Sequence, residues 1–357
     1  MNRRAAMVLF LLWCLPPHLG AKSAWRGDNE ARLQKMMRES AGSGPSAIFD
    51  WDNTVIKNDI GDATFFWMIL HDQIHRPSSW KKTSRYLTPA AVMALNRDCP
   101  LSSPDPLPTS VHPACEDTLL GIYHDGLVVG KPAWLKRYDP DRMEPAYAWA
   151  VQLMAGHSPQ EVREITLQVI WFSLKQKVGA QQKIGNKSYP SSIRIYEPMR
   201  RLIRDLQKNQ FDVWVVSASS QYLVESFAKR VGIQPDRVIG VRSKLDDQGR
   251  LTGAFEPCGG EETIPYRKGK VCWIDKIIRR PITFAAGDSD SDLFFLQKAT
   301  RLRLVINRNK RELMCHAYSN QDGNGLINPM FIEPKPKKSE VYHCQEFGLP
   351  DQEDSVY

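Results

Sequence analysis

The sequence predicts an α/β fold, a doubly wound parallel sheet with helices on both faces. From residue 196 onward, helix-like and strand-like segments alternate along the chain, as parallel βαβ units require. An apolar run at residues 47–49 precedes this region and is typical of a buried strand. Between the two lies a long stretch, residues 60–192, whose pattern is mostly helical.

The first half contains few strands. A polar helix-like segment at residues 28–39 leads through a loop of Gly, Ser and Pro into the apolar run. In the helical stretch we expect Asp62 to cap one helix and Ser158 to begin another that runs to residue 174. A proline-rich loop at residues 97–113 lies between these helices.

The second half supplies the rest of the sheet. We expect helices and strands in alternation, the helices at residues 197–208, 221–231, 270–278 and 290–298, and the strands at residues 211–216, 238–241, 282–286 and 302–306. The tail from residue 333 onward looks extended, and Cys344 is the residue that could tie it down.

Composition is that of a globular protein. Hydrophobic residues make up 42% of the 357 residues and charged residues 25%, which argues against wholesale disorder and against a multi-span membrane protein. The net charge of +8 is moderate, and the basic residues form no stripe interleaved with aromatic residues. We therefore expect no nucleic-acid partner.

The N-terminus has the pattern of a secretory signal peptide. Arg3 and Arg4 precede an apolar block at residues 5–15, and small residues follow up to Ala21, after which we place cleavage. An apolar block this short cannot span a bilayer core of about 30 Å, so no stable membrane anchor is expected. An uncleaved amphipathic helix is the alternative, but no polar face interrupts the block. The protein is accordingly expected to be secreted or periplasmic.

Cysteine usage agrees with an oxidising compartment. Of seven cysteines, Cys14 leaves with the signal peptide and six remain. Fifteen pairings are possible, and proximity in the chain suggests Cys99 with Cys115, Cys258 with Cys272 and Cys315 with Cys344. A zinc site is the competing interpretation, but no closely spaced CxxC or HxxxH pattern supports it.

Two carboxylates follow the first strand. Asp50 and Asp52 are one residue apart, so they point the same way on an extended backbone. Two like charges this close raise each other's pKa, and such a pair usually shares a proton or binds a divalent metal. An acidic turn after a buried strand is the alternative at this stage.

Polar residues also follow two later strands. Ser217 and Ala218 come after residues 211–216 and before a helix, where a hydroxyl and backbone N–H groups can bind an anion. The hydroxyl of Ser217 could equally cap that helix. Asp288, Asp290 and Asp292 lie at the junction of the strand at residues 282–286 and the next helix, and Asp290 could serve as a helix cap.

These strand ends should meet at one edge of the sheet, where open α/β sheets bind ligands. Asp288 and Asp292, beside Asp50 and Asp52, would provide oxygen ligands for one Mg²⁺, with water and a substrate phosphate completing the octahedron. A lysine at the start of the helix between these loops could neutralise nucleophile and phosphate. Lys270 is the first choice, and Lys268 the alternative.

Four motifs in this order resemble those of phosphatases of the haloacid dehalogenase superfamily. The chain is similar to that family over residues 45–310, through the DxDxT pattern at residues 50–54, Ser217, Lys270 and the GDxxxD pattern at residues 287–292. The resemblance implies that Asp50 attacks phosphorus to form an aspartyl-phosphate, which water hydrolyses. It also implies that Asp52 is the general acid and then the general base.

The resemblance assigns the remaining site residues as well. The substrate phosphate is expected to contact Thr54, Ser217, Ala218 and Lys270. Asp50, Asp288 and the backbone carbonyl of Asp52 are expected to ligate Mg²⁺. Asp292 is expected to position these ligands without contacting the metal itself.

The helical stretch corresponds to the cap domain of that family, inserted after the first strand. The implied organisation is a signal peptide at residues 1–21, an α/β core at residues 22–60 and 193–332, a cap at residues 61–192 and an extension at residues 333–357. Among secreted members, the chain looks most like phosphorylcholine phosphatases and phosphoserine-phosphatase-like hydrolases. The cap is rich in aromatic residues, which can cage a quaternary ammonium group, although most such rings serve as helix core.

The leading hypothesis is a secreted Mg²⁺-dependent phosphomonoesterase that acts on a small phosphorylated metabolite, with phosphocholine as a candidate. A phosphotransferase using the same aspartyl-phosphate is one alternative. A non-catalytic binder of phosphorylated or choline-bearing ligands is another, but Asp52 argues against it because a binder has no use for an acid/base.

Overall fold

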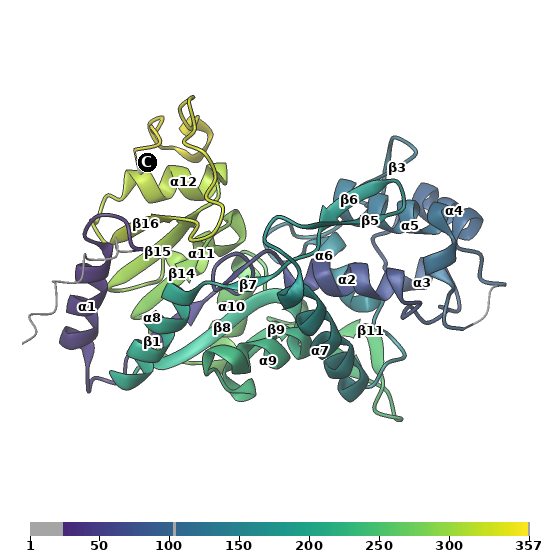
Figure 1. Cartoon of the computed structure of the whole chain (residues 1–357), viewed down its shortest axis with the longest axis horizontal. Helices are drawn as coiled ribbons and strands as arrows, with labels where there is room; N and C mark the ends of the chain where they lie inside the picture. Colours follow the sequence, from purple (N-terminus) through teal and green to yellow (C-terminus); the bar gives the residue numbers. More distant parts are fainter. Residues whose placement is uncertain (1–23, 103–104, 356–357) are drawn as a thin grey trace, which may run out of the picture.

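A computed structural model describes residues 24–102 and 105–355 of the chain. The expected signal peptide at residues 1–21 lies outside these described residues. The molecule has two lobes, one built on a parallel sheet and one mostly helical (Figure 1). Within the described ranges, no helix is both long enough and apolar enough to cross a membrane.

A six-stranded parallel sheet forms the first lobe. Its order is β16-β15-β14-β1-β8-β9. The strands are β1 (Ser46–Phe49), β8 (Asp212–Ser220), β9 (Val238–Val241), β14 (Phe284–Gly287), β15 (Leu302–Asn307) and β16 (Gly325–Pro329). The chain builds outward from β1 first on one side and then on the other, so β1 is the point at which the strand order reverses. Ligands bind at such a point in open α/β sheets.

Helices cover both faces of this sheet, as the sequence predicted. Ala47 and Phe49 of β1 belong to one buried cluster and Ile48 to another, because successive side chains of a strand point to opposite faces. The first cluster includes residues of α1 (Asn29–Ser40), α8 (Glu197–Lys208) and α9 (Gln221–Ala228). The second includes residues of α10 (Lys268–Ile277), α11 (Leu293–Leu296) and α12 (Arg311–Ser319).

The second lobe is inserted between β1 and β8. Its α-helices are α2 (Ile60–Leu70), α3 (Trp80–Thr83), α4 (Pro89–Asp98), α5 (Pro113–Leu120), α6 (Pro145–Gln152) and α7 (Pro159–Lys175). It also contains the 3₁₀ turn η1 (Thr109–Val111), the π-helical turn η2 (Gly121–Asp125), and the hairpins β3 (Leu127–Val128) with β4 (Lys131–Pro132) and β5 (Gln181–Ile184) with β6 (Lys187–Pro190).

Short paired strands join the lobes. β2 (Ile56–Lys57) pairs antiparallel with β7 (Arg194–Ile195), so the chain enters and leaves the helical lobe side by side. A hairpin of β10 (Ser243–Leu245) and β11 (Leu251–Phe255) reaches from the sheet lobe to α6, where Gln152 Nε2 donates to the Gly253 carbonyl at 2.8 Å. The remaining short elements are η3 (Lys229–Val231), η4 (Pro235–Arg237), β12 (Pro257–Cys258), β13 (Glu261–Glu262), η5 (Asp290–Asp292) and η6 (Gln345–Phe347).

The structure differs from the expected elements in several places. β8 continues to Ser220 and α9 begins at Gln221, so Ser217 and Ala218 lie within the strand and not between a strand and a helix. The sequence prediction omitted α12 and the edge strand β16, which begins with Gly and ends with Pro, both unfavourable in strands. The helix expected at residues 290–298 is instead η5 followed by a single α-helical turn, α11. Asp59 rather than Asp62 caps α2, because the Asp59 carboxylate accepts the N–H of Asp62 at 3.0 Å.

Three disulfides join the six described cysteines in the predicted pairs, Cys99–Cys115, Cys258–Cys272 and Cys315–Cys344. The last of these fastens the C-terminal extension to α12. Within the extension, Tyr342 bridges to Gln352, and the buried carboxylate of Asp354 accepts the N–H of Lys338 at 2.9 Å. The described part of the extension is therefore packed on the sheet lobe.

The contact between Trp51 and Phe227 packs α9 against the segment that follows β1. Both side chains are fully buried, and their rings meet edge to face at 5.5 Å. We expect Phe227→Ala to lower the free energy of unfolding by about 3–5 kcal/mol, measured by urea denaturation, because it leaves a cavity. Leu167→Ala on the exposed side of α7 should change the free energy by no more than about 0.5 kcal/mol. An equal effect of the two substitutions would contradict this account.

Candidate active site

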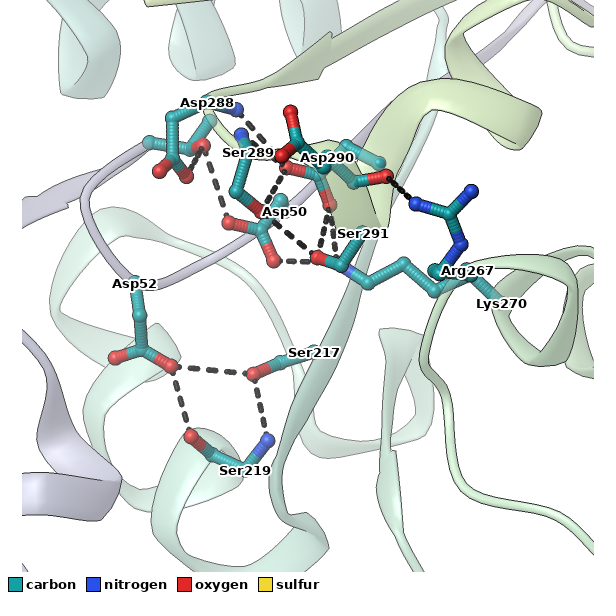
Figure 2. A network of polar contacts seen from close by, with 12 residues as sticks. Asp50, Asp52, Ser217, Ser219, Arg267, Lys270, Asp288, Ser289, Asp290 and Ser291 are labelled. Carbon is teal, nitrogen blue, oxygen red and sulfur yellow. Dashed lines mark hydrogen bonds and ion pairs between the residues drawn. The ribbon is translucent and has the colours of Figure 1, made fainter. Parts of the chain in front are cut away.

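Three carboxylates meet at the carboxyl ends of β1 and β14. Asp50 directly follows β1, and its backbone N–H donates to the Ala286 carbonyl of β14 at 2.9 Å. Oxygen atoms of Asp50, Asp288 and Asp292 all lie within 4.8 Å of one another, and all three residues are buried. Figure 2 shows Asp50 and Asp288 facing each other above the end of the strand. Buried charges of one sign in this arrangement require cations nearby.

Lys270 provides one such cation. Its Nζ lies 2.6 Å from Asp50 Oδ1 and 2.6 Å from Asp292 Oδ1, and its side chain is 1% exposed. Burial acts to lower the pKa of Lys270, but Asp292 and Asp50 outweigh it, so its pKa is raised and the ammonium stays charged. Lys268, the alternative from the sequence, instead pairs with Asp141 outside this cluster.

The charge balance around Asp50 favours an additional cation. Burial, and then the charge of Asp292, raise the pKa of Asp50 well above its usual range, although Lys270 opposes the shift. The two cations in contact with the cluster, Lys270 and Arg308, therefore do not compensate three buried carboxylates. Oxygen atoms in this number and spacing are the donor set that Mg²⁺ prefers, so the residues fit a divalent metal.

Thr54 lies between two of these carboxylates. Its hydroxyl is 2.7 Å from Asp288 Oδ1 and 3.1 Å from Asp50 Oδ2. The sequence assigned Thr54 to the substrate phosphate, and the structure places its hydroxyl on the carboxylates instead. The residue thus fixes the two carboxylates relative to each other, and a contact with phosphate stays a prediction.

Asp292 is held by donors on both of its oxygens. Oδ2 accepts the backbone N–H groups of Asp288 at 2.9 Å and Ser289 at 3.0 Å, and Oδ1 accepts Lys270. These contacts suit a residue that orients the Asp288 loop and Lys270 more than one that ligates a metal directly. Asp290 faces elsewhere, since its carboxylate accepts the N–H of Leu313 in α12 at 2.8 Å.

Asp52 points away from this cluster. Figure 2 shows its carboxylate directed toward Ser217 and Ser219, whose hydroxyls lie 3.2 and 2.8 Å from Oδ2, while Oδ1 accepts the N–H of Ile60 at 2.8 Å. Burial, and then the charge of Asp59, raise the pKa of Asp52 well above its usual range. The Asp52 side chain thus lies outside the metal-type cluster to which the sequence assigned it, which leaves only its backbone carbonyl for a metal.

The turn between Asp50 and α2 explains this orientation. Asn53 has a φ of 62°, a left-handed conformation that Asn tolerates, and its side-chain oxygen accepts the N–H of Asn58 at 3.1 Å. The tight turn reverses the chain immediately after the two aspartates. As a consequence the N-terminus of α2 lies over Asp52.

The site opens into a cavity of about 260 Å³ between the two lobes. Asp50, Asp52, Ser217, Ala218 and Lys270 line one side of it. The strand-end loops that the sequence expected to converge therefore do meet.

The helical lobe lines the other side with acids and phenols. Asp59, Asp62, Tyr123 and Tyr147 face the cavity, and the Tyr123 hydroxyl donates to Asp62 Oδ1 at 2.7 Å. Burial, and then the charge of Asp62, raise the pKa of Asp59 to about 7. Burial also raises the pKa of Asp62 to about 6, although the Tyr123 hydroxyl opposes the shift.

Arg308 is a residue of the site that the sequence did not predict. This residue directly follows β15 and reaches the cavity, where its Nη1 lies 2.5 Å from Asp288 Oδ2. The rule that drew attention to Ser217, a polar residue at the end of a parallel strand, would also have identified Arg308. Asp59 lacked a comparable signal, because a helix cap normally needs no functional explanation.

A buried aspartate beside a lysine, a second aspartate with separate hydroxyl donors, and an inserted helical lobe are features expected of a hydrolase of the phosphatase type. Residues 123–297 match the family model described as haloacid dehalogenase-like hydrolase. This stretch of the chain is similar to that family, and the four motifs lie in the order expected of it.

The chain is also similar to a curated protein and to solved structures. The chain is 23% identical over 317 residues to a phosphorylcholine phosphatase of Pseudomonas aeruginosa strain PAO1. The aligned region covers 80% of each protein. A crystal structure of a functionally unknown protein from Anaerococcus prevotii DSM 20548 superimposes with a TM-score of 0.63 at 20% identity, covering 85% of this chain and 92% of that one. A substrate-bound phosphoserine phosphatase is a more distant likeness, with a TM-score of 0.37 at 17% identity, covering 73% and 85% of the two chains.

Gly287 tests the placement of Asp292. A Cβ added at Gly287 would lie 2.6 Å from Asp292 Cβ, so Gly287→Ala must displace the Asp292 side chain and with it the Asp288 loop. Because a shift of about 1 Å in a reaction centre costs about 10²-fold, we expect kcat for p-nitrophenyl phosphate to fall by that factor. Gly253→Ala is the control, since no atom lies within 4 Å of a Cβ there, and equal rates in the two variants would refute the placement.

Proposed function

We propose that this protein is a secreted Mg²⁺-dependent phosphomonoesterase that acts through an aspartyl-phosphate on a small phosphorylated substrate. The observation that carries the proposal is the separation of the two aspartates. Asp50 is held by Lys270 and Thr54, whereas Asp52 is held by Ser217, Ser219 and a helix N–H. Neighbouring carboxylates with different environments are typical of a nucleophile and an acid/base working as a pair.

In the first step, a carboxylate oxygen of Asp50 attacks phosphorus and the bond from phosphorus to the leaving oxygen breaks. Asp52, whose raised pKa favours the protonated form, donates its proton to that leaving oxygen. In the second step, Asp52 accepts a proton from water as the water oxygen attacks phosphorus. The bond between phosphorus and Asp50 breaks, and inorganic phosphate is released.

Lys270 supports both steps. Its buried ammonium contacts Asp50 and can also reach an oxygen of the phosphoryl group bound there, which stabilises charge in a site that excludes water. Asp50, Asp288 and the Asp52 carbonyl would hold Mg²⁺, with Asp292 orienting them. When bound, the metal supplies positive charge that neutralises the phosphoryl oxygens.

The cavity wall favours a cationic leaving group. Asp59 and Asp62 supply negative charge, and Tyr123 and Tyr147 supply aromatic faces at the position where a leaving group would lie. A quaternary ammonium group over an aromatic face gains about 0.5–2 kcal/mol, and a carboxylate adds Coulomb attraction. Phosphocholine is therefore the proposed substrate, in agreement with the name of the Pseudomonas relative.

Secretion is the proposed location. The three disulfides are compatible with an oxidising compartment, and the expected signal peptide would direct the chain there. We also propose the domain boundaries that the sequence predicted, with the helical lobe acting as the cap.

The assignment of the two aspartates predicts different defects. We expect Asp50→Asn to abolish release of phosphate from p-nitrophenyl phosphate and phosphocholine, because no covalent intermediate can form. Asp52→Asn should lower kcat by about 10²–10⁴-fold, the usual contribution of a general acid or base. Chelation of Mg²⁺ should stop turnover, and adding it back should restore activity.

Asp275→Asn is the control, since Asp275 is exposed and pairs with Lys298 on the surface. Full activity in Asp50→Asn would contradict the proposal. Product analysis with an added alcohol acceptor separates hydrolysis from phosphotransfer, because transfer yields a new phosphate ester in place of inorganic phosphate.

Asp59 and Asp62 in the cavity wall predict that the KM of a cationic substrate depends on pH. As pH falls from 8 to 5, Asp59 and Asp62, whose pKa values lie near 7 and 6, take up protons and lose the charge that attracts an ammonium group. We expect the KM of phosphocholine, relative to that of 3,3-dimethylbutyl phosphate, to rise about tenfold, which corresponds to about 1.4 kcal/mol. The carbon isostere carries the same phosphate, so titration of the phosphate cancels.

Asp62→Asn should raise the KM of phosphocholine at pH 8 and flatten the pH dependence of the ratio, while Asp125→Asn, at an exposed ion pair with Lys187, should change neither. A KM ratio that stays constant from pH 8 to pH 5 in the wild type would rule out recognition by charge.

A further inference from the structure

Arg308 contributes a second cation to the carboxylate cluster. Its guanidinium approaches Asp288 from the side opposite Thr54, since Thr54 occupies Oδ1 and Arg308 Nη1 lies 2.5 Å from Oδ2. The side chain is only 25% exposed, and it lines the same cavity as Asp50 and Lys270. None of the four motifs includes this residue.

The loop that carries Arg308 is fixed from outside the site. The next residue, Asn309, has a φ of 60°, and its side chain is held at both ends by the C-terminal extension. The Tyr342 hydroxyl donates to Asn309 Oδ1 at 2.7 Å, and Asn309 Nδ2 donates to the Pro336 carbonyl at 3.3 Å. Tyr342 is fully buried and lies two residues before Cys344, whose disulfide fastens the extension.

Three carboxylates and two cations leave the cluster with a net charge of −1, one positive charge short of neutrality. The carboxylates are Asp50, Asp288 and Asp292, and the cations are Lys270 and Arg308. A divalent metal would turn this small excess of negative charge into a small excess of positive charge. A phosphate dianion would then restore the original balance.

The position of Arg308 thus has opposite consequences for the two ligands of the site. A fixed positive charge beside Asp288 repels a divalent cation and attracts a phosphoryl group, and both effects are large where water is excluded. The charge of Arg308 also acts on Asp59 and Asp62, where it opposes the rise of their pKa, but the direct contact of the guanidinium is with Asp288.

We propose that Arg308 is a charge-balancing and positioning residue that weakens binding of the divalent metal and strengthens binding of the phosphate, and that the C-terminal extension holds it in place through Asn309. This inference rests on the proposed function. It assigns to the extension a role in the reaction centre, although none of its described residues, 333–355, lines the cavity.

Two titrations of the purified mature protein test the proposal. Isothermal titration calorimetry measures Mg²⁺ binding without substrate, and then inorganic phosphate binding to the Mg²⁺-loaded protein. We expect Arg308→Met to tighten Mg²⁺ binding about tenfold and to weaken phosphate binding about tenfold, since it removes the charge and keeps most of the volume. Arg308→Lys keeps the charge and should stay within about threefold of wild type for both ligands.

A merely structural role for Arg308 gives a different pattern. If Arg308→Met weakens both ligands together, or changes neither, the proposal is overturned. Tyr342→Phe provides a second route that leaves Arg308 in the chain and removes only the hydrogen bond to Asn309. Like Arg308→Met, it should tighten Mg²⁺ binding and weaken phosphate binding, but by a smaller factor. Unchanged affinities would refute the role of the extension.

The same titrations separate this proposal from the proposed function. Wild-type protein that binds neither Mg²⁺ nor phosphate would overturn both. Wild-type protein that binds both ligands and hydrolyses phosphocholine, with parallel losses in Arg308→Met, would overturn only the role assigned to Arg308.

Discussion

The reaction centre depends on one buried ion cluster, in which Lys270 bridges Asp50 and Asp292. Taking these charges out of water costs several kcal/mol for each ion, and the contacts at 2.6 Å offset that cost only while every partner is present. Removing any one of them leaves an uncompensated charge in the interior. The cluster therefore requires that the end of β1, the start of α10 and the loop after β14 converge within hydrogen-bonding distance. Asp50 and Lys270, for example, lie 220 residues apart in the sequence.

The surrounding fold satisfies this requirement through the strand order. β1 lies at the centre of the sheet, and its neighbours β8 and β14 bring Ser217 and Asp288 to the same edge. The tight turn at Asn53 then places Asp52 against the hydroxyls from β8 instead of against the Lys270 cluster. Two aspartates one residue apart thus acquire different environments, and this difference makes a division into nucleophile and acid/base chemically reasonable.

Covalent bonds reinforce the segments that the central sheet holds least. Cys258–Cys272 joins the β12 turn to α10 two residues from Lys270, Cys99–Cys115 closes the proline-rich loop of the helical lobe, and Cys315–Cys344 fastens the extension to α12. Cross-links of this kind stabilise a fold mainly by restricting the unfolded chain. In this protein two of the three also fix elements that carry or support charged residues of the cavity.

The sequence by itself determined the class of fold, the strand-to-helix alternation and the residues that meet at the sheet edge, because these follow from local periodicity and from the rule that parallel strands present their carboxyl ends together. Proximity in the chain only suggested the disulfide pairs, which the structure then confirmed. It could not determine that Asp52 turns toward Ser219, that Thr54 bridges Asp50 and Asp288, or that Arg308 contacts Asp288, because each depends on distant contacts. The weak edge strand β16 and the cap Asp59 were likewise decided by packing, since their local propensities are unremarkable or unfavourable. Local patterns specify backbone direction and spacing, whereas only the assembled tertiary structure decides which polar atom each buried side chain meets.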